Sequence, residues 1–231
     1  MLKIELHARY LGRYCNSILT DPVTTSNATL PLVETNLHPL SNPAAPGVPI
    51  PGAADVNINL NILFNISTLK FTVNGATFIP PTVPVLLQIL SGAQTAQDLM
   101  PAGSIYGLPP NKVIEISMPG GSIGSPHPFH LHGHSFSVVR SAGSSGYNFE
   151  NPVRRDVVSL GTSPSDNVTI RFVTDNPGPW ILHCHIDWHL ELGLAVVMAE
   201  DVADIPKVTK PPTSWDQLCP IYDALPPQVF P

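Results

Sequence analysis

Histidine is concentrated in two short segments of this sequence. Of nine histidines, seven fall between His127 and His189, whereas His7 and His38 stand apart. The first segment reads His127-Pro128-Phe129-His130-Leu131-His132-Gly133-His134, and the second reads His183-Cys184-His185-Ile186-Asp187-Trp188-His189. Imidazole is the commonest metal ligand among side chains, and a thiolate is a soft ligand that suits metals such as copper. These residue types therefore predict a metal centre.

Strand geometry divides the ligands of the second segment into two sets. Successive side chains on a strand point to opposite faces, so Cys184 should point one way and both His183 and His185 the other. His189 follows Cys184 after a turn and can return to the side of the cysteine. One thiolate would then face one metal site while two imidazoles face another, and the single residue of backbone between them is a short covalent path for electrons.

The first segment can complete both sites. A thiolate with two imidazoles is the trigonal ligand set of a blue-copper site, and one of the imidazoles has to come from outside the second segment. His130 and His132 are two residues apart and share a strand face, while Pro128 fixes the backbone and can aim His127 separately. Zinc could use these histidines, but it gives no reason for a cysteine flanked by two of them. No ligand role is left for His134, which we expect to be a supporting or core histidine.

The composition favours a folded, loop-rich β protein. Hydrophobic residues make up 43% and charged residues 12% of the 231 residues, the opposite of a disordered chain. There are 27 prolines, well above an average usage of about 5%, and proline disrupts helices. The composition therefore disfavours a helical bundle. The net charge of −6, with basic residues spread along the chain, argues against a nucleic-acid partner.

Neither a membrane span nor a signal peptide is expected. The apolar runs, such as Ala195-Val196-Val197-Met198, fall far short of the ~20 residues that a membrane helix needs. Charged residues including Glu5, Arg9 and Arg13 interrupt residues 1–18, where a signal peptide would be apolar.

Short apolar segments that alternate with turn residues predict a β-sandwich from residue 56 onward. Residues 1–55 carry turn and linker signals such as Asp21-Pro22 and Pro46-Gly47, so we expect a leader before a domain that spans 56–231. The expected strands span residues 56–66, 112–118, 135–140, 167–173, 180–185 and 194–200. A short helix is expected over 83–90, and a last helix over 214–225 is expected to break at Pro220.

Three sequons, at Asn27, Asn65 and Asn167, are candidate N-glycosylation sites if the chain is secreted.

Beyond these segments, the sequence resembles fungal laccases, which are phenol-oxidising multicopper oxidases. The two histidine segments look like the third and fourth copper motifs of that family. The resemblance extends roughly over residues 16–222, and it includes Val33-Glu34-Thr35-Asn36-Leu37-His38-Pro39-Leu40, residues 81–98, Thr174-Asp175-Asn176-Pro177-Gly178-Pro179-Trp180 and Leu218-Cys219-Pro220-Ile221-Tyr222. It implies an all-β, cupredoxin-like Greek-key β-sandwich with short helices in its loops. Residues 1–55 would be the remnant of a preceding cupredoxin domain with its linker, and residues 56–231 the C-terminal copper-binding domain.

The resemblance also assigns roles to the metal ligands. It implies type 1 copper ligands at His127, Cys184 and His189, a type 2 ligand at His130, and type 3 ligands at His132, His183 and His185. Leu194, ten residues after the ligand cysteine, would occupy the axial position without acting as a ligand. A phenol would give up one electron near the edge of His189, and the electron would cross Cys184 to a three-copper cluster that reduces dioxygen to water. Secretion is implied as well.

The sequence departs from the family pattern in one respect. Two further His-x-His motifs complete the family's cluster, but outside the two segments only His7 and His38 remain, and neither is in such a motif. The type 1 set is thus complete and the three-copper set half supplied. We therefore expect a partial gene product, a truncated form or a cleaved C-terminal half whose partner is the missing N-terminal domains. The resemblance would pair Cys219 with an absent cysteine, and a Cys15–Cys219 bridge is left open.

Alternative functions follow from the same residues. The intact type 1 set could serve a non-enzymatic, single-copper electron carrier, or the chain could be an inactive fragment. A trimeric copper nitrite reductase is disfavoured because the His183 and His185 pair implies a binuclear oxygen site.

Overall fold

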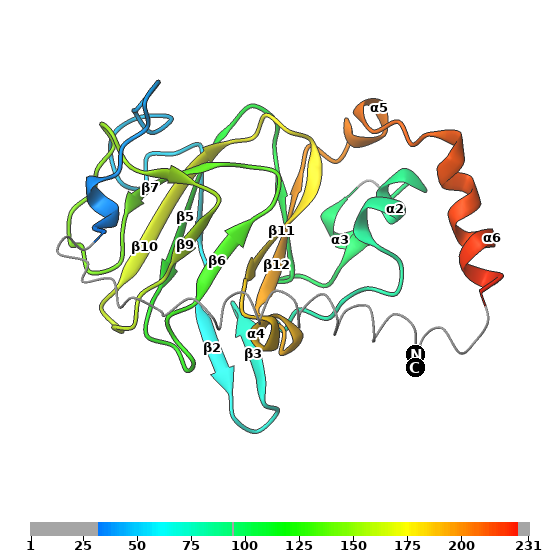
Figure 1. Cartoon of the computed structure of the whole chain (residues 1–231), viewed down its shortest axis with the longest axis horizontal. Helices are drawn as coiled ribbons and strands as arrows, with labels where there is room; N and C mark the ends of the chain where they lie inside the picture. Colours follow the sequence, from blue (N-terminus) through cyan, green and yellow to red (C-terminus); the bar gives the residue numbers. More distant parts are fainter. Residues whose placement is uncertain (1–31, 94, 226–231) are drawn as a thin grey trace, which may run out of the picture. The chain divides into compact units, whose positions relative to one another are not determined.

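The structure is a computed structural model that describes residues 32–93 and 95–225. Two five-stranded sheets pack face to face, one in the order β1-β5-β10-β7-β8 and the other in the order β4-β12-β11-β6-β9 (Figure 1). Strands β2 and β3 form a separate hairpin. The first sheet contains β1 (Val56–Asn59), β5 (Val113–Pro119), β7 (Phe136–Arg140), β8 (Arg154–Arg155) and β10 (Asn167–Val173), and the second contains β4 (Ile105–Leu108), β6 (Pro128–Leu131), β9 (Val157–Ser159), β11 (Gly178–Cys184) and β12 (Ala195–Glu200). The hairpin strands are β2 (Ile62–Asn65) and β3 (Lys70–Val73).

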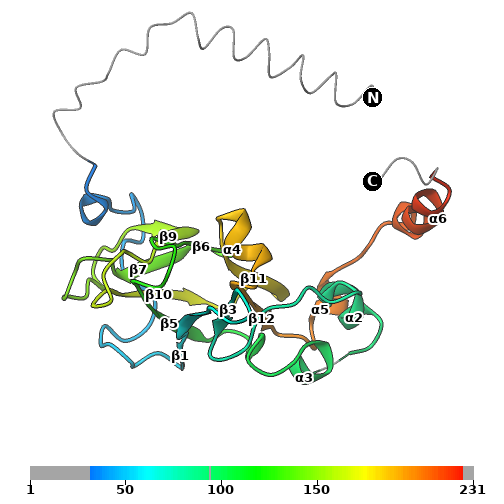
Figure 2. The ribbon, with the colours of Figure 1, turned by 90° about the horizontal axis from the view of Figure 1, so that it is seen from below.

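Short helices occupy the connections between strands, as Figures 1 and 2 show. They are η1 (Glu34–Asn36), α2 (Val85–Leu90), α3 (Ala96–Leu99), α4 (Asp187–Glu191), α5 (Ile205–Val208), η2 (Thr213–Gln217) and α6 (Leu218–Asp223). The expectation of a β-sandwich with short helices in its loops is therefore confirmed. Within the described residues, no helix is long and apolar enough to cross a membrane.

Alternating side chains on the strands build the core between the two sheets. In β10, Val168, Ile170 and Phe172 point into the core, while Thr169 and Arg171 lie on the outer face of the sheet. The same core receives residues from the second sheet, including Phe129, Leu131, Leu182, Cys184, Val196 and Met198. The side chain of Cys184 is completely buried there.

The segment that precedes β1 lies against the outer face of the first sheet, and the buried guanidinium of Arg171 holds it there. Arg171 is fully buried, and its Nη atoms donate to the carbonyl oxygens of Pro46 at 3.2 Å, Val48 at 2.6 Å and Ile50 at 2.6 Å. Its Nε and Nη2 each lie 2.7 Å from Glu115 Oε2. These contacts tie the irregular segment to the sandwich. The division after residue 55 remains a prediction.

Two expected elements differ from those observed. The strand expected over 56–66 is two strands, because β1 pairs with β5 in parallel whereas β2 pairs with β3 in the hairpin. The last helical region divides before Leu218, so the predicted break at Pro220 is wrong. Pro220 lies in the first turn of α6, where a missing N–H costs little because the first four N–H groups of a helix have no intrahelical partner. The short helix expected over 83–90 is present as α2.

Several sequence predictions fall outside the described part of the chain. Residues 1–31 include His7, Cys15, the sequon at Asn27 and the region tested for a signal peptide. The predictions for these residues, including the possible Cys15–Cys219 bridge, therefore stay predictions.

Candidate metal centre

Strand pairing brings the two histidine segments together. Strand β6 lies antiparallel to β11, with His130 opposite His183 and Phe129 opposite Cys184. The amide of His185 donates to the carbonyl of Pro128 at 2.7 Å, which extends the pairing past the end of β11. The two segments, residues 127–134 and 183–189, are far apart in the sequence but face each other in neighbouring strands (Figure 1).

The parity of β11 separates the side chains as expected. Cys184 Sγ lies 3.6 Å from His127 Nδ1 and 3.4 Å from His189 Nδ1, and the two Nδ1 atoms are 3.0 Å apart. A point equidistant from three such atoms lies about 2 Å from each, close to the ~2.0–2.1 Å of a metal–imidazole bond. One thiolate and two imidazoles are the trigonal donor set of blue-copper sites, so these residues fit a copper ion.

Helix α4 returns His189 to the side of the cysteine. The amide of His189 donates to the carbonyl of Ile186 at 2.9 Å, which closes the turn after β11. The amide of Leu194 donates to the carbonyl of His189 at 2.9 Å, and the amide of Cys184 donates to the carbonyl of Leu194 at 3.1 Å. These backbone bonds hold Cys184, His189 and Leu194 in one tight unit.

Burial acts differently on the two imidazoles and on the thiol. It lowers the pKa of His127 from 6.5 to about 4, with a smaller contribution from nearby His189. Burial also lowers the pKa of His189 and raises the pKa of the Cys184 thiol. Both imidazoles are therefore neutral near pH 7, as a ligand must be, whereas the thiol keeps its proton until a metal displaces it.

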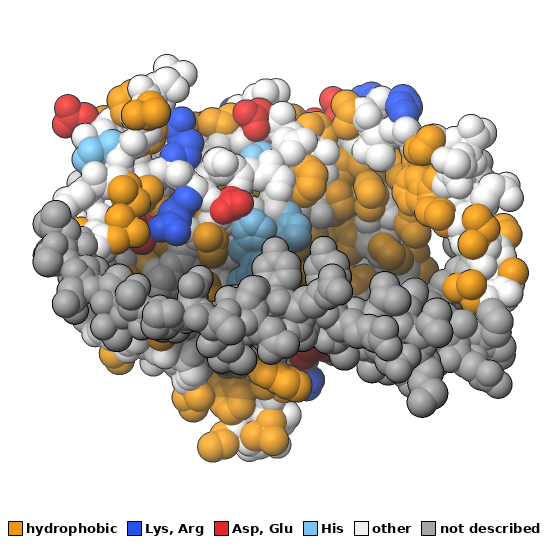
Figure 3. All heavy atoms as spheres, viewed as in Figure 1, with side chains coloured by type: hydrophobic (Ala, Val, Ile, Leu, Met, Phe, Trp, Pro, Cys, Tyr) orange, Lys and Arg blue, Asp and Glu red, His pale blue; other side chains and the backbone are white. Residues whose placement is uncertain are grey.

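Four further histidines gather on the opposite side of the Cys184 backbone. His132 Nε2 and His183 Nε2 are 3.1 Å apart, and the rings of His183 and His185 stack with centroids 5.6 Å apart. The centroid of His130 lies 4.7 Å from that of His132 and 5.7 Å from that of His185. Figure 3 shows histidine side chains together on one face of the molecule.

Backbone contacts fix which nitrogen of two of these rings is free to bind a metal. His183 Nδ1 lies 2.9 Å from the carbonyl oxygen of Cys184, and His130 Nδ1 lies 2.7 Å from that of Asp156. A carbonyl accepts only from an N–H, so both Nδ1 atoms carry the proton and both Nε2 atoms keep a free lone pair. Metal-binding histidines commonly have such a carbonyl partner.

The two sets differ in how completely they converge. Among the described residues, only His127, Cys184 and His189 bring three donor atoms within 4.8 Å of one another. The side chains of His132 and His185 are exposed, so the four-histidine set is open on one side. Partial desolvation by the surrounding rings, followed by the nearby imidazoles of His130 and His185, lowers the pKa of His132 and favours its neutral form.

Leu194 is completely buried beside the cysteine. Its axial role rests on the resemblance and remains a prediction. Met198 lies opposite Trp180 in the β11–β12 pairing, several residues along the sheet from the end that carries Cys184.

Two residues that shape the site formed by His127, Cys184 and His189 were not predicted from the sequence. The ring of Phe71, on β3, packs 5.5 Å from that of His127 and 5.1 Å from that of His189. Gly124 has φ +81°, and a Cβ there would lie 2.8 Å from His189 Nε2. The sequence held no signal for Phe71, whereas the Gly120-Gly121-Ser122-Ile123-Gly124 run just before His127 could have indicated a close backbone approach.

Comparisons with known proteins agree with this geometry. A family model described as multicopper oxidase matches residues 78–204. Laccase-2 of Pleurotus ostreatus is 65% identical over 213 residues, which cover 92% of this chain and 39% of that protein. A laccase of Phlebia radiata is 61% identical over 92% of this chain and 41% of its own length. The chain thus spans about two fifths of the length of the curated relatives it matches.

Solved structures show the same fold. Fet3p, a multicopper oxidase that functions in iron import, aligns with a TM-score of 0.71 and 27% identity over 89% of this chain and 42% of its own. The laccase from Botrytis aclada aligns with a TM-score of 0.61 and 25% identity over 76% of this chain and 34% of its own.

Proposed function

Because the chain belongs to the multicopper oxidase family, we propose that it is part of a copper-dependent oxidoreductase of laccase type. The proposed reaction is the one-electron oxidation of phenols, coupled to the four-electron reduction of dioxygen to water. The observation that carries the proposal is the convergence of His127, Cys184 and His189, a donor set that suits copper. High identity to fungal laccases supports the phenolic substrate class.

The residue roles follow from the two faces of β11. His127, Cys184 and His189 would hold the type 1 copper, His130 the type 2 copper, and His132, His183 and His185 the type 3 pair. Copper supplies one-electron redox chemistry when it is bound. His189 contributes Nδ1 to the donor set, so the opposite edge of its ring, beside Gly124, is the side from which a phenol would give up an electron.

Two routes join the face of Cys184 to that of the four histidines. One is covalent, through the peptide bonds on either side of Cys184 to His183 and His185. The other is the 2.9 Å hydrogen bond from His183 Nδ1 to the carbonyl of Cys184. Both are short, and both end on imidazoles assigned to the type 3 pair. Cys184 and His189 are therefore the proposed redox-active residues.

Full activity would need histidines that this sequence does not supply. No further His-x-His motif exists outside the two segments. The proposed partners are the preceding cupredoxin domains, which would contribute the rest of the cluster, and without them the chain would not reduce dioxygen efficiently. There are two alternative functions. The complete type 1 set favours a non-enzymatic, single-copper electron-transfer module, and the second alternative is an inactive fragment.

Copper counting and oxygen uptake test these proposals. The purified 231-residue chain, loaded with copper, should hold about one tightly bound copper and show the intense blue absorption of a thiolate–copper bond. It should consume little oxygen with a phenol. Steady oxygen uptake by the chain alone would show that the missing ligands are not needed. Failure to bind any copper would contradict both copper functions and support the inactive fragment.

Secretion, N-glycosylation and a role in lignin degradation belong to the same proposal. Asn65 is exposed where β2 ends, and the amides of Ser67 and Thr68 donate to its side-chain oxygen at 2.9 and 3.2 Å. Asn167 begins β10 and is partly exposed. Protein secreted by a fungal host should lose mass on treatment with an N-glycosidase, and an unchanged mass would contradict the glycoprotein assignment.

A further inference from the structure

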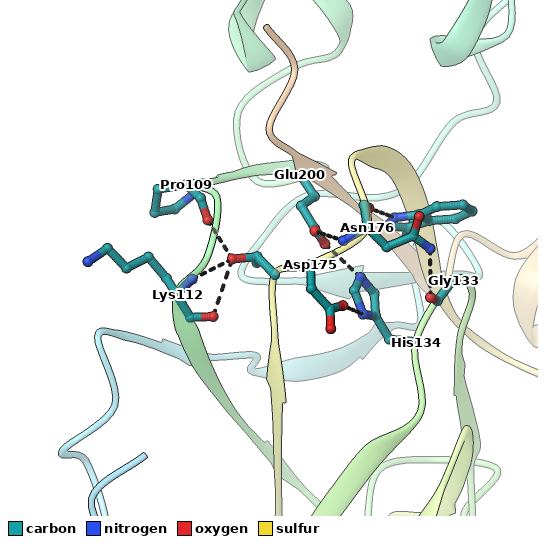
Figure 4. A network of polar contacts seen from close by, with 9 residues as sticks. Pro109, Lys112, Gly133, His134, Asp175, Asn176 and Glu200 are labelled. Carbon is teal, nitrogen blue, oxygen red and sulfur yellow. Dashed lines mark hydrogen bonds and ion pairs between the residues drawn. The ribbon is translucent and has the colours of Figure 1, made fainter. Parts of the chain in front are cut away.

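A buried polar network lies directly behind the turn that follows His132. His134 Nε2 donates to Glu200 Oε2 at 2.6 Å, and the amide of Asn176 donates to Glu200 Oε1 at 2.6 Å (Figure 4). The side chains of His134 and Glu200 are 5% and 1% exposed, so this hydrogen bond is almost wholly shielded from water. Asp175 lies at its rim, 3.7 Å from His134 Nδ1, and its side chain is 72% exposed.

The same network holds the turn itself. The side-chain amide of Asn176 donates to the carbonyl of Gly133 at 2.9 Å, and the indole N–H of Trp180 donates to the carbonyl of Asn176 at 2.7 Å. Gly133 has φ +76°, and a Cβ there would lie 2.3 Å from the indole ring. The backbone after His132 is therefore pressed onto Trp180 and bonded to Asn176.

These contacts place His132 between two fixed points. On its N-terminal side, the amide of Leu131 donates to the carbonyl of Asp156 at 3.0 Å. The amide of His132 itself donates to the carbonyl of Ile181 at 3.0 Å. After it, the turn is held by Gly133 and His134. The position of His132 Nε2, 3.1 Å from His183 Nε2, thus depends on partners at the start of β11 and the end of β12.

We propose that His134 and Glu200 are positioning residues that orient His132 toward His183 at the metal centre. The inference rests on the proposed function, in which these two imidazoles hold copper. A buried hydrogen bond to a carboxylate, here 2.6 Å long, is directional, unlike an apolar contact, and fixes the turn in one arrangement. Outer partners of metal ligands commonly have this effect, and their loss typically weakens metal binding about 10- to 100-fold.

The test uses the metal-free 231-residue chain with Zn²⁺ as the probe, and NMR follows the ring resonances of each histidine. Replacing His134 alone by an apolar residue would leave Glu200 buried and unpaired, so the main variant is His134→Leu with Glu200→Leu, which removes both partners. His134→Gln is the conservative variant, since its amide keeps a donor near the place of Nε2. Asp175→Asn is the matched control at the exposed rim.

The double variant should shift or broaden the ring signals of His132 and His183 without metal, and weaken their Zn²⁺ binding about 10- to 100-fold. The signals of His127 and His189 should not change. His134→Gln and Asp175→Asn should both remain close to the wild type. A purely structural role would lower the thermal midpoint of every disruptive variant without moving these signals.

Two results would overturn the proposal. One is a folded double variant whose His132 and His183 signals and Zn²⁺ affinity match the wild type. The other is a loss of order that affects His127 and His189 equally. If Zn²⁺ shifts the ring signals of neither His132 nor His183 in the wild type, these histidines do not bind metal and that part of the proposed function is wrong. The metal-free spectra then still test the positioning role.

Discussion

Acid should destabilise the copper-free protein through His127. This histidine has a pKa of about 4 in the folded chain, against 6.5 when unperturbed. Because its folded pKa is depressed, the unfolded chain binds the proton first as pH falls. The stabilisation is therefore complete above about pH 6.5 and is lost progressively down to about pH 4. A shift of this size corresponds to roughly 3 kcal/mol, at about 1.4 kcal/mol per pKa unit.

Urea unfolding of the copper-free chain between pH 7.5 and 4 measures this loss. Wild type should lose at least the ~3 kcal/mol from His127, because burial depresses the pKa of His189 in the same direction. His127→Leu should flatten the profile. Val138→Ala, which removes buried volume without a titrating group, should lower stability at every pH and keep the wild-type slope. If His127→Leu keeps the full wild-type slope, burial of this imidazole is not the cause.

Three further substitutions test the site and its support. Cys184→Ser should abolish the blue absorption of the copper-loaded chain, since a hydroxyl is a poor soft ligand, and a variant that stays blue would refute the ligand assignment. Leu194→Met should lower the potential of the blue site, measured by redox titration, because a thioether favours Cu(II); an unchanged or higher potential would mean that Leu194 is not axial. Arg171→Met should cost about 3–5 kcal/mol in urea unfolding by leaving Glu115 buried without its partner, and Glu115→Leu in the same chain should recover much of it. Equal stability of the single and double variants would argue against the ion pair as the cause.

The parts of the site that depend on strand parity could be predicted from the sequence. The two-residue period of a strand was enough to place Cys184 on one face and His183 with His185 on the other. The strand over 167–173 was equally predictable, because Val168, Ile170 and Phe172 alternate with polar residues. Local rules of this kind need no knowledge of distant partners.

The contacts between distant segments could not be predicted in this way. Phe71 lies on a four-residue strand with no long alternation, yet its ring covers two ligands that follow more than fifty residues later. Glu200 is the last residue of an otherwise apolar strand, and no pattern in the sequence distinguishes it. Its pairing with His134 depends on how β12 lies beside β11, which no local pattern encodes.

Strand β11 carries both halves of the site, and this limits how the segment can change. Every side chain between Trp180 and Cys184 keeps its face only while the number of residues is preserved, because a slip of one residue inverts the whole strand. A single insertion there would send the thiol toward the four histidines and an imidazole into the core. Natural drift and laboratory libraries can therefore vary the chemistry of this segment, but they must hold its length constant.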